Sequence, residues 1–269
     1  INVGVRAARH ALIAQVDQDV VVRPGWLARL VAAVEQAPDV AAAQGQYVSD
    51  RADGAWVAVS GLDLQQRWAA IRSDALDHVC TGNTVYRASA LAAVGGVAED
   101  MGYGYDNDLS YRLCAAGFRL VLCRDATSVH RLRPGLRAYV GRQYGYGYGR
   151  LDLIARHPRR YGGDQVSGAN MILHAAGMSV ALAAVVALAP LGLWPHALAL
   201  AGVVVAALAL ERLVAGARAA WRFGDAAGWL FPLAHLLRDL AWGAAVGVWA
   251  LRRVTRRATR PEHSMRRSS

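Results

Sequence analysis

The sequence predicts an α/β domain that is followed by helices associated with a membrane. Three observations support this fold class. In residues 1–165, short apolar runs of strand length alternate with stretches of helical periodicity. Two acidic clusters, around residues 17 and 106, stand at the ends of such elements. From residue 171 to residue 210 the chain is nearly all Ala, Val and Leu, which is enough for two spanning helices.

Composition narrows the class of protein further. The chain has 269 residues and a formal net charge of +10, and all of its basic residues are Arg. Its three cysteines form no Cys-x-x-Cys pair and no disulfide framework, which suits a reducing compartment. Much of the positive charge lies in the last residues, where anionic lipid is a simpler partner than nucleic acid. The first residue, Ile1, falls in mid-pattern, so we expect a preceding piece of the protein.

The first acidic cluster predicts a metal site. Residues 15–22 are expected to form a strand that delivers Asp17 and Asp19. Side chains at positions i and i+2 of a strand share a face, so the two carboxylates would repel each other without a cation between them. Oxygen ligands of this kind suit Mg²⁺ or Mn²⁺ shared with substrate phosphates. A pair of solvated turn residues is the alternative.

The elements around this cluster are predicted from periodicity. Residues 3–14 read as the end of a helix, which would place Arg9 within reach of a diphosphate; a solvated helix face is an equally good interpretation. Residues 26–36 predict an amphipathic helix with Trp26, Leu27, Leu30, Val31 and Val34 on its apolar face. A strand over 40–47 and a helix over 61–77 follow.

A small polar loop, Cys80-Thr81-Gly82-Asn83, comes next in the chain. Gly82 would allow close approach of the backbone, and the Asn83 amide would hydrogen-bond a sugar hydroxyl. An ordinary turn explains the loop equally well on local grounds. Residues 88–94 predict a short helix that ends at Gly95-Gly96.

The second acidic cluster opens a helix that ends at Gly117. Asp106 stands where an N-cap belongs, and Asp108 is expected to pair with Arg112 at the i, i+4 spacing. That pairing would leave Asp106 at the mouth of the helix, free for chemistry. The alternative is that Asp106 only caps the helix.

Two further stretches carry candidate ligands. A buried strand over 118–123 leads to His130, whose imidazole would complete the metal site. Residues 139–150 alternate Tyr with Gly beside Arg142 and Gln143, which predicts a flexible surface where Tyr stacks on sugars and Arg binds phosphate. An interfacial aromatic belt is the alternative.

Hydropathy predicts a membrane region over residues 166–251 and an Arg-rich tail over 252–269. Two spans are expected, with a third apolar helix whose charged residues suit an interfacial or re-entrant position. The positive-inside rule places the tail in the cytoplasm, and an even number of crossings then keeps residues 1–165 there too. The expected helices cover about 171–190, 195–211 and 229–251, with an interfacial segment at 211–227.

In this order, the elements resemble the family 2 glycosyltransferases, which are inverting enzymes of the GT-A fold. The resemblance rests on Ala-Arg before Asp-x-Asp, then Pro-Gly-Trp-Leu, Thr-Gly-Asn, Asp-x-Asp-Leu-x-x-Arg-Leu and Val-His, over residues 4–157. It implies a Rossmann-like nucleotide-sugar domain in which Asp106 is the general base. The implied ligands of Mg²⁺ or Mn²⁺ are Asp17, Asp19 and His130. The residues expected to contact the donor are Arg9, Asp17, Gly82, Asn83, Asp108, Arg112, Arg142 and Gln143.

The chain also departs from the family pattern. Tyr105 stands where many members have Glu, and the first nucleotide-binding strands are missing. The Gln-x-x-Arg-Trp motif of processive synthases is absent, so we expect a non-processive transferase. The expected donor is a UDP-, GDP- or dTDP-sugar, and the expected acceptor is lipid-linked or a membrane-proximal glycan at the cytosolic face of the inner membrane. A processive polysaccharide synthase and an inactive membrane-anchored scaffold remain alternatives.

Overall fold

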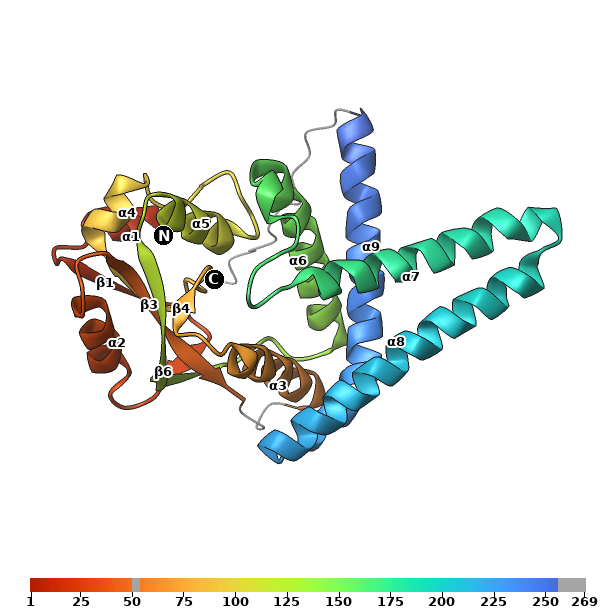
Figure 1. Ribbon diagram of the computed structural model, residues 1–269, viewed down its shortest axis with the longest axis horizontal. Helices are drawn as coiled ribbons and strands as arrows, with labels where there is room; N and C mark the ends of the chain where they lie inside the picture. Colours follow the sequence, from red (N-terminus) through yellow and green to blue (C-terminus); the bar gives the residue numbers. More distant parts are fainter. Residues whose placement is uncertain (50–53, 256–269) are drawn as a thin grey trace, which may run out of the picture.

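The computed structural model describes residues 1–49 and 54–255 (Figure 1). Most of the predicted Arg-rich tail, residues 256–269, lies outside this range. The described chain has two visible parts. A sheet with helices on both faces occupies one end, and four long helices occupy the other.

Six strands form one mixed sheet. They are β1 (Leu12–Val16), β2 (Val20–Val22), β3 (Val40–Val48), β4 (Ala75–Leu76), β5 (Asn83–Arg87) and β6 (Arg119–His130). The order is β1-β5-β3-β6-β2, and β4 pairs with β6. Only β3 and β6 run parallel among the described pairs. The predicted α/β class is therefore confirmed.

Alternating side chains cover the two faces of the sheet. Ala43 and Val85 pack with the buried side of α2 (Trp26–Glu35). Their neighbours Ala42 and Tyr86 point the other way, into a second cluster. Four helices supply or flank that cluster: α1 (Asn2–Ala7), α3 (Ala55–Ala70), α4 (Ala88–Ala93) and α5 (Tyr105–Ala115).

Several predicted elements are confirmed, and others are wrong in their bounds. The helix predicted at 26–36, the strand at 40–47 and the helix at 88–94 are α2, β3 and α4. Leu27 is exposed, so it does not belong to the buried face of α2. The helix predicted over 61–77 corresponds to α3 (Ala55–Ala70), which begins and ends earlier than predicted. The prediction of helix up to residue 77 was wrong because Ala75 and Leu76 pair with β6 as the strand β4. The strand predicted over 118–123 continues to His130 as β6.

The remaining helices form the other end of the molecule. α6 (Leu136–Arg156) and α9 (Phe231–Thr255) lie side by side, and α7 (Ala169–Leu188) and α8 (Trp194–Phe223) project from them as a long hairpin (Figure 1). Short 3-10 turns connect them: η1 (Pro158–Arg160), η2 (Ala189–Leu191) and η3 (Ala226–Leu230). The segment predicted as interfacial at 211–227 largely continues α8, up to Phe223.

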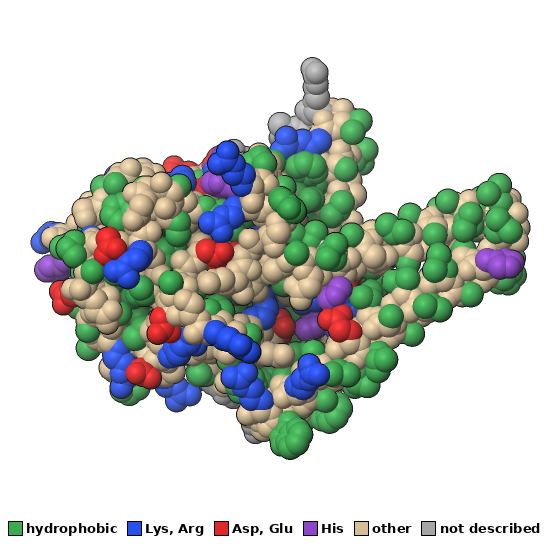
Figure 2. Space-filling model, viewed as in Figure 1, with side chains coloured by type: hydrophobic (Ala, Val, Ile, Leu, Met, Phe, Trp, Pro, Cys, Tyr) green, Lys and Arg blue, Asp and Glu red, His purple; other side chains and the backbone are tan. Residues whose placement is uncertain are grey.

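The hairpin has the length and composition of two membrane spans. Ala169–Leu191 and Trp194–Phe223 are the two described segments that are long and apolar enough to cross a bilayer. Charged side chains gather over the sheet domain and at the base of the hairpin, while hydrophobic side chains cover its projecting part (Figure 2). Exposed apolar residues of the hairpin include Leu173, Val180, Val186, Val203 and Leu210.

The Tyr-Gly repeat is a helix interface and not a flexible surface, contrary to the sequence prediction. It lies within α6, whose glycines bring neighbouring elements close. A Cβ at Gly145 would come 2.2 Å from the Tyr103 ring, and one at Gly149 would come 2.5 Å from the Tyr103 Cβ. A Cβ at Gly147 would come 2.9 Å from the Trp242 Cα on α9. The repeat therefore lets α6 pack between the sheet domain and α9.

Buried charges join the hairpin to the rest of the molecule. Arg212 of α8 forms an ion pair with Asp239 of α9, and both side chains are almost fully buried. Asp63 of α3 lies 2.9 Å from Arg67 Nη2 and 3.2 Å from His235 Nε2 of α9. Because the contact between Asp63 and His235 crosses the predicted boundary at residue 165, α3 is continuous with the helical part in packing.

Candidate active site

Asp17 and Asp19 lie in a tight turn and not on the predicted continuous strand. β1 ends at Val16, and β2 begins at Val20 on the opposite edge of the sheet. The chain crosses the ends of the central strands between them, and the turn closes through a 3.0 Å bond from Val20 N to Asp17 O. The strand prediction failed because β1 and β2 pair with different partners.

Asp17 rests against Gly82 of the small polar loop. The Asp17 N–H donates to the Gly82 carbonyl at 3.1 Å, and a Cβ at Gly82 would come 2.2 Å from Asp17 Oδ2. Gly82 therefore makes room for this carboxylate. Burial raises the pKa of Asp17, and the charges of Asp19 and Asp106 raise it further against the lowering effect of His130. Charges from both acidic clusters therefore influence the pKa of the Asp17 carboxyl.

Asp19 pairs with His130. Asp19 Oδ1 lies 3.3 Å from His130 Nε2, and the imidazole stacks on Tyr47 with ring centroids 5.6 Å apart. The hydrogen bond with His130 lowers the pKa of the Asp19 carboxyl. The predicted proximity of these two residues is confirmed. Asp17 is not part of a compact three-ligand group with them among the described residues.

Asp106 sits in the first turn of α5 and is not its N-cap. Gly104 caps the helix with a left-handed φ of 78°, and Asp106 Oδ1 accepts from the Asn107 N–H at 2.9 Å. The other oxygen is free of such a local bond and faces His78. Tyr105 hydrogen-bonds Thr81, which connects the start of α5 to the small polar loop. Burial raises the pKa of the Tyr105 hydroxyl to about 12.

His78 is a candidate functional residue that the sequence reasoning missed. It is 5% exposed, and its Nε2 lies 3.5 Å from Asp106 Oδ2. Its Nδ1 lies 3.9 Å from Asp164 Oδ1. A lone His between Asp77 and Val79 gives no periodic signal, so only its place just before the polar loop could have drawn notice.

Asp164 stands behind His78 in a dense polar environment. Asn107 Nδ2 donates to it at 2.9 Å, Tyr111 Oη at 3.2 Å, and Arg150 at 3.2 Å. Burial alone would raise the pKa of Asp164, but His78, Arg150 and backbone N–H groups together lower it. Asp164 is therefore ionised and fixed in orientation.

Asn83 does not have the role predicted for it. Its side chain is fully buried, its Nδ2 donates to the Gly45 carbonyl at 2.7 Å, and its Oδ1 accepts from Trp26 Nε1 at 2.6 Å. Because the side chain is fully buried, a sugar hydroxyl cannot reach its remaining N–H or lone pair. The amide instead holds the start of α2 against the centre of the sheet.

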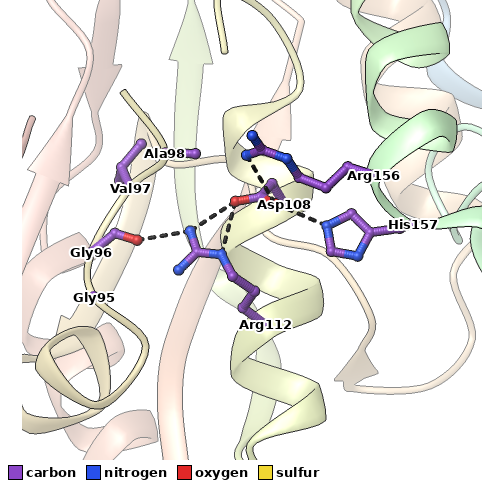
Figure 3. Close-up of a pocket in the computed structure, with 8 residues that line it drawn as sticks. All are labelled: Gly95, Gly96, Val97, Ala98, Asp108, Arg112, Arg156 and His157. Carbon is purple, nitrogen blue, oxygen red and sulfur yellow. Dashed lines mark hydrogen bonds and ion pairs between the residues drawn. The ribbon is translucent and has the colours of Figure 1, made fainter. Parts of the chain in front are cut away.

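Asp108 and Arg112 pair as predicted, but away from Asp106. Side chains two residues apart on a helix point about 200° apart around its axis, so Asp108 faces the opposite side of α5. Asp108 is fully buried, with Arg112 Nε at 2.8 Å and His157 Nε2 at 2.9 Å. Arg156 lies 3.6 Å away, and the group lines a separate cavity of about 290 Å³ (Figure 3). The structure does not bring these two residues to the donor side.

The other predicted donor contacts are dispersed. Arg9 is exposed before β1, at the end of that strand opposite to Asp17, because residues predicted as helix form a strand. Arg142 donates to Ser60 Oγ of α3 at 3.0 Å, and Gln143 is buried in α6. The structure therefore brings together Asp17, Asp19, Gly82, Asp106 and His130, and leaves Arg9 apart from them.

The family model described as glycosyl transferase family group 2 matches residues 12–214. The pre-mycofactocin glycosyltransferase of Mycobacterium tuberculosis is 34% identical over 173 residues, which are 62% of this chain and 37% of that protein. The succinoglycan biosynthesis protein ExoA of Rhizobium meliloti is 30% identical over 115 residues, 43% of this chain and 35% of that protein. The chain thus spans little more than a third of the length of these curated relatives.

Among solved structures, the chain is similar to a mannosyltransferase from Pyrobaculum calidifontis in complex with GDP-Man and Mn²⁺, at a TM-score of 0.46 and 18% identity. The match covers 89% of this chain and 65% of that one.

Proposed function

This chain belongs to glycosyl transferase family group 2, and from that premise we propose that it moves a sugar from a nucleotide-sugar donor to a membrane-proximal acceptor. The proposed reaction is metal-dependent, inverting and non-processive. The observation that carries the proposal is that the small polar loop contacts both acidic clusters, 89 residues apart in the chain (106 − 17): Gly82 packs against the Asp17 carboxylate, and Cys80 Sγ lies within 4.8 Å of an Asp106 oxygen. Family membership makes the chain a transferase with a GT-A-type α/β fold.

The residues of the Asp17–Asp19 turn fit a divalent metal. Mg²⁺ and Mn²⁺ are commonly held by one or two protein ligands, with substrate phosphates and water in the other positions. Asp19 and His130 would supply two adjacent donors, and Asp17 would take a place beside the diphosphate. When bound, the metal stabilises negative charge on the departing nucleoside diphosphate.

Asp106 is proposed as the general base. Its free carboxylate oxygen would accept the proton of the acceptor hydroxyl, whose oxygen then bonds to the anomeric carbon as the bond to the diphosphate breaks. Attack from the face opposite to the leaving group inverts that carbon, and no covalent enzyme intermediate is needed. The His78 imidazole, 3.5 Å away, would position this carboxylate. UDP-, GDP- and dTDP-sugars are the donor class.

The hairpin of α7 and α8 supports a membrane-proximal acceptor. Its length and apolar composition fit two spans, and Arg252 and Arg253 at the end of α9 are basic residues suited to the cytosolic side. We propose a cytosolic-facing domain on the inner membrane that acts on a lipid-linked or glycan acceptor. In this proposal the catalytic domain ends at residue 165, the membrane region begins at residue 166, and the tail over 252–269 lies in the cytosol.

A transfer assay tests this function. The full chain in detergent is supplied with UDP-, GDP- and dTDP-sugars, Mn²⁺ and a membrane lipid extract, and radiolabelled product is counted. Asp106→Asn is expected to lower turnover about 10²–10⁴-fold while donor affinity, measured by calorimetry, is kept. Asp125→Asn, an exposed carboxylate away from the turn, is the matched control. Near-normal turnover of Asp106→Asn would refute the assignment of the base.

A further inference from the structure

We propose that His78, Cys80 and Asp106 form a second metal site, distinct from Asp19 and His130, that takes a thiophilic divalent cation of the Zn²⁺ type. These residues offer one nitrogen, one sulfur and one oxygen donor. The three donor atoms all lie within 4.8 Å of one another, and no other such group of three occurs among the described residues.

The spacing suits metal ligands better than hydrogen bonds. His78 Nε2 and Asp106 Oδ2 are 3.5 Å apart, which is long for a bond between nitrogen and oxygen. Two donors bound to one tetrahedral Zn²⁺, at about 2.0–2.1 Å each, are separated by about 3.3 Å. A cation between these atoms therefore requires little movement of either side chain.

His78 is the independent observation that points to a ligand. Its side chain is only 6% exposed, yet its ring nitrogens make no hydrogen bond and have only the long ion-pair contacts with Asp106 and Asp164. Buried polar atoms without partners are uncommon, because desolvation is left uncompensated. The Nε2 atom faces Asp106, and a metal between them would satisfy it.

Asp164 has the position of a second-sphere partner. Histidines that bind metal through one nitrogen usually turn the other N–H toward a carboxylate or carbonyl. His78 Nδ1 lies 3.9 Å from Asp164 Oδ1, and Asp164 is itself held by Asn107, Tyr111 and Arg150. The array of Asp164, His78 and metal would thus repeat a known zinc arrangement.

Cys80 decides which metal is preferred. Thiolate sulfur favours Zn²⁺ and related cations over Mg²⁺ and Mn²⁺, which prefer oxygen. Cys80 is a free thiol, and its sulfur lies within 4.8 Å of the donor atoms of His78 and Asp106. Three protein ligands leave a fourth position for water, as in open zinc sites.

Occupation of this site would stop transfer. A carboxylate oxygen bound to Zn²⁺ no longer accepts a proton from an acceptor hydroxyl, so zinc would inhibit through Asp106. This consequence rests on the proposed function, in which Asp106 is the base. Metal binding itself does not depend on that role, so the two are separable by experiment.

Cobalt spectroscopy tests the site directly. The full chain in detergent, with excess Mg²⁺ to occupy oxygen sites, is titrated with Co²⁺ as a probe for Zn²⁺. We expect a thiolate-to-cobalt charge-transfer band that saturates at one equivalent and disappears when Zn²⁺ is added. Cys80→Ser should lose the band, and Cys123→Ser, a matched thiol on β6, should keep it. No band in the parent chain, or a band that survives Cys80→Ser, would overturn the proposal.

Two further measurements keep the test decisive. Asp164→Asn should weaken Co²⁺ affinity about 10–100-fold, as expected for an outer partner, and circular dichroism checks that each variant folds. The ratio of transfer rate with Zn²⁺ to the rate without it should fall in the parent chain and stay near one in Cys80→Ser. A cobalt band without any transferase activity would refute the proposed function but not the site. A band with no inhibition by zinc in an active enzyme would exclude Asp106 as a ligand.

Discussion

The carboxylate of Asp19 lies 3.3 Å from the imidazole of His130, although 111 residues separate them in the chain (130 − 19). The register of two strands produces this contact. Val20, the first residue of β2, is paired with His130, the last residue of β6. The register of β2 and β6 therefore determines the positions of both donors. A hydrogen bond of 2.7 Å from the Arg131 N–H to the Asp19 carbonyl lies at the same end of the strand pair.

Removing either partner of this pair should weaken metal-dependent donor binding. We expect Asp19→Ala and His130→Ala each to raise the Mn²⁺ concentration that gives half-maximal transfer. The increase should exceed ~10-fold, because loss of a residue that only hydrogen-bonds a metal ligand already costs that much. Mn²⁺ titration of the transfer rate measures this. The exposed His10→Ala is the control, and an unchanged Mn²⁺ requirement in both variants would contradict the assignment.

Gly82→Ala should disable Asp17 without unfolding the protein. The added Cβ would lie 2.2 Å from Asp17 Oδ2, so that side chain must turn away. Misplacement of about 1 Å lowers kcat/KM on the order of 10²-fold. Steady-state kinetics should show that Gly82→Ala combined with Asp17→Ala is no worse than Asp17→Ala alone, because both act through one carboxylate. Additive losses would show that Gly82 acts in another way.

Gly147→Ala and Gly141→Ala should have opposite effects on stability. Both lie in α6, where Ala normally stabilises a helix by about 0.5–1 kcal/mol relative to Gly. A Cβ at Gly141 meets no atom within 4 Å, whereas one at Gly147 lies 2.9 Å from the Trp242 backbone. We expect Gly141→Ala to raise the Tm. Gly147→Ala should lower the Tm, with a loss of about 1–3 kcal/mol in the free energy of unfolding. Equal shifts would mean that α6 and α9 are not in close contact.

Asp63 should stabilise the helical end at all but acidic pH. Burial alone would raise its pKa, but Arg67, His235 and Arg238 outweigh this and bring it below its ordinary value of 3.8. A lowered pKa in the folded state means that the stabilisation is complete above the unfolded value and is lost as pH falls through the folded one.

The test compares Asp63→Asn with the parent chain. Removal of one partner from a fully buried pair costs about 3–5 kcal/mol, and the Asp63 side chain is 17% exposed, so the variant should lose somewhat less stability than this, by the same amount at every pH above about 5. The difference should shrink as pH falls below 3.8, because the unfolded parent chain then takes up a proton that the folded chain does not. Asp39→Asn, whose pair with Arg119 is solvent-exposed, should show a much smaller difference. A Tm gap that widens in acid would contradict this interpretation.

Much of the site could be predicted from the sequence because its donors follow short, ordered motifs. Asp17, Asp19, Asp106 and His130 each lie next to a turn or element end, where local patterns are informative. The family resemblance then supplied their relation in space. The α/β class followed from alternating elements for the same reason.

The errors have non-local causes. Asn83 looked available because its partner Trp26 is 57 residues away, and nothing local shows that the amide is engaged and buried. Asp108 was grouped with Asp106 because the two are close in sequence. On an α-helix, however, side chains two residues apart point to opposite sides. His78 acquires meaning only from Asp106 and Asp164, which approach it from distant segments. The glycines of α6 suggested mobility, whereas they permit close packing.

The buried pair of Arg212 and Asp239 has a consequence for how the chain is made. α8 leaves the ribosome before α9, so the guanidinium of Arg212 exists for a time without its counter-charge. An isolated charge enters an apolar environment only at a high cost, so the nascent hairpin cannot settle fully until the following helix has been synthesised. Assembly of this end of the molecule is thereby coupled to the progress of translation.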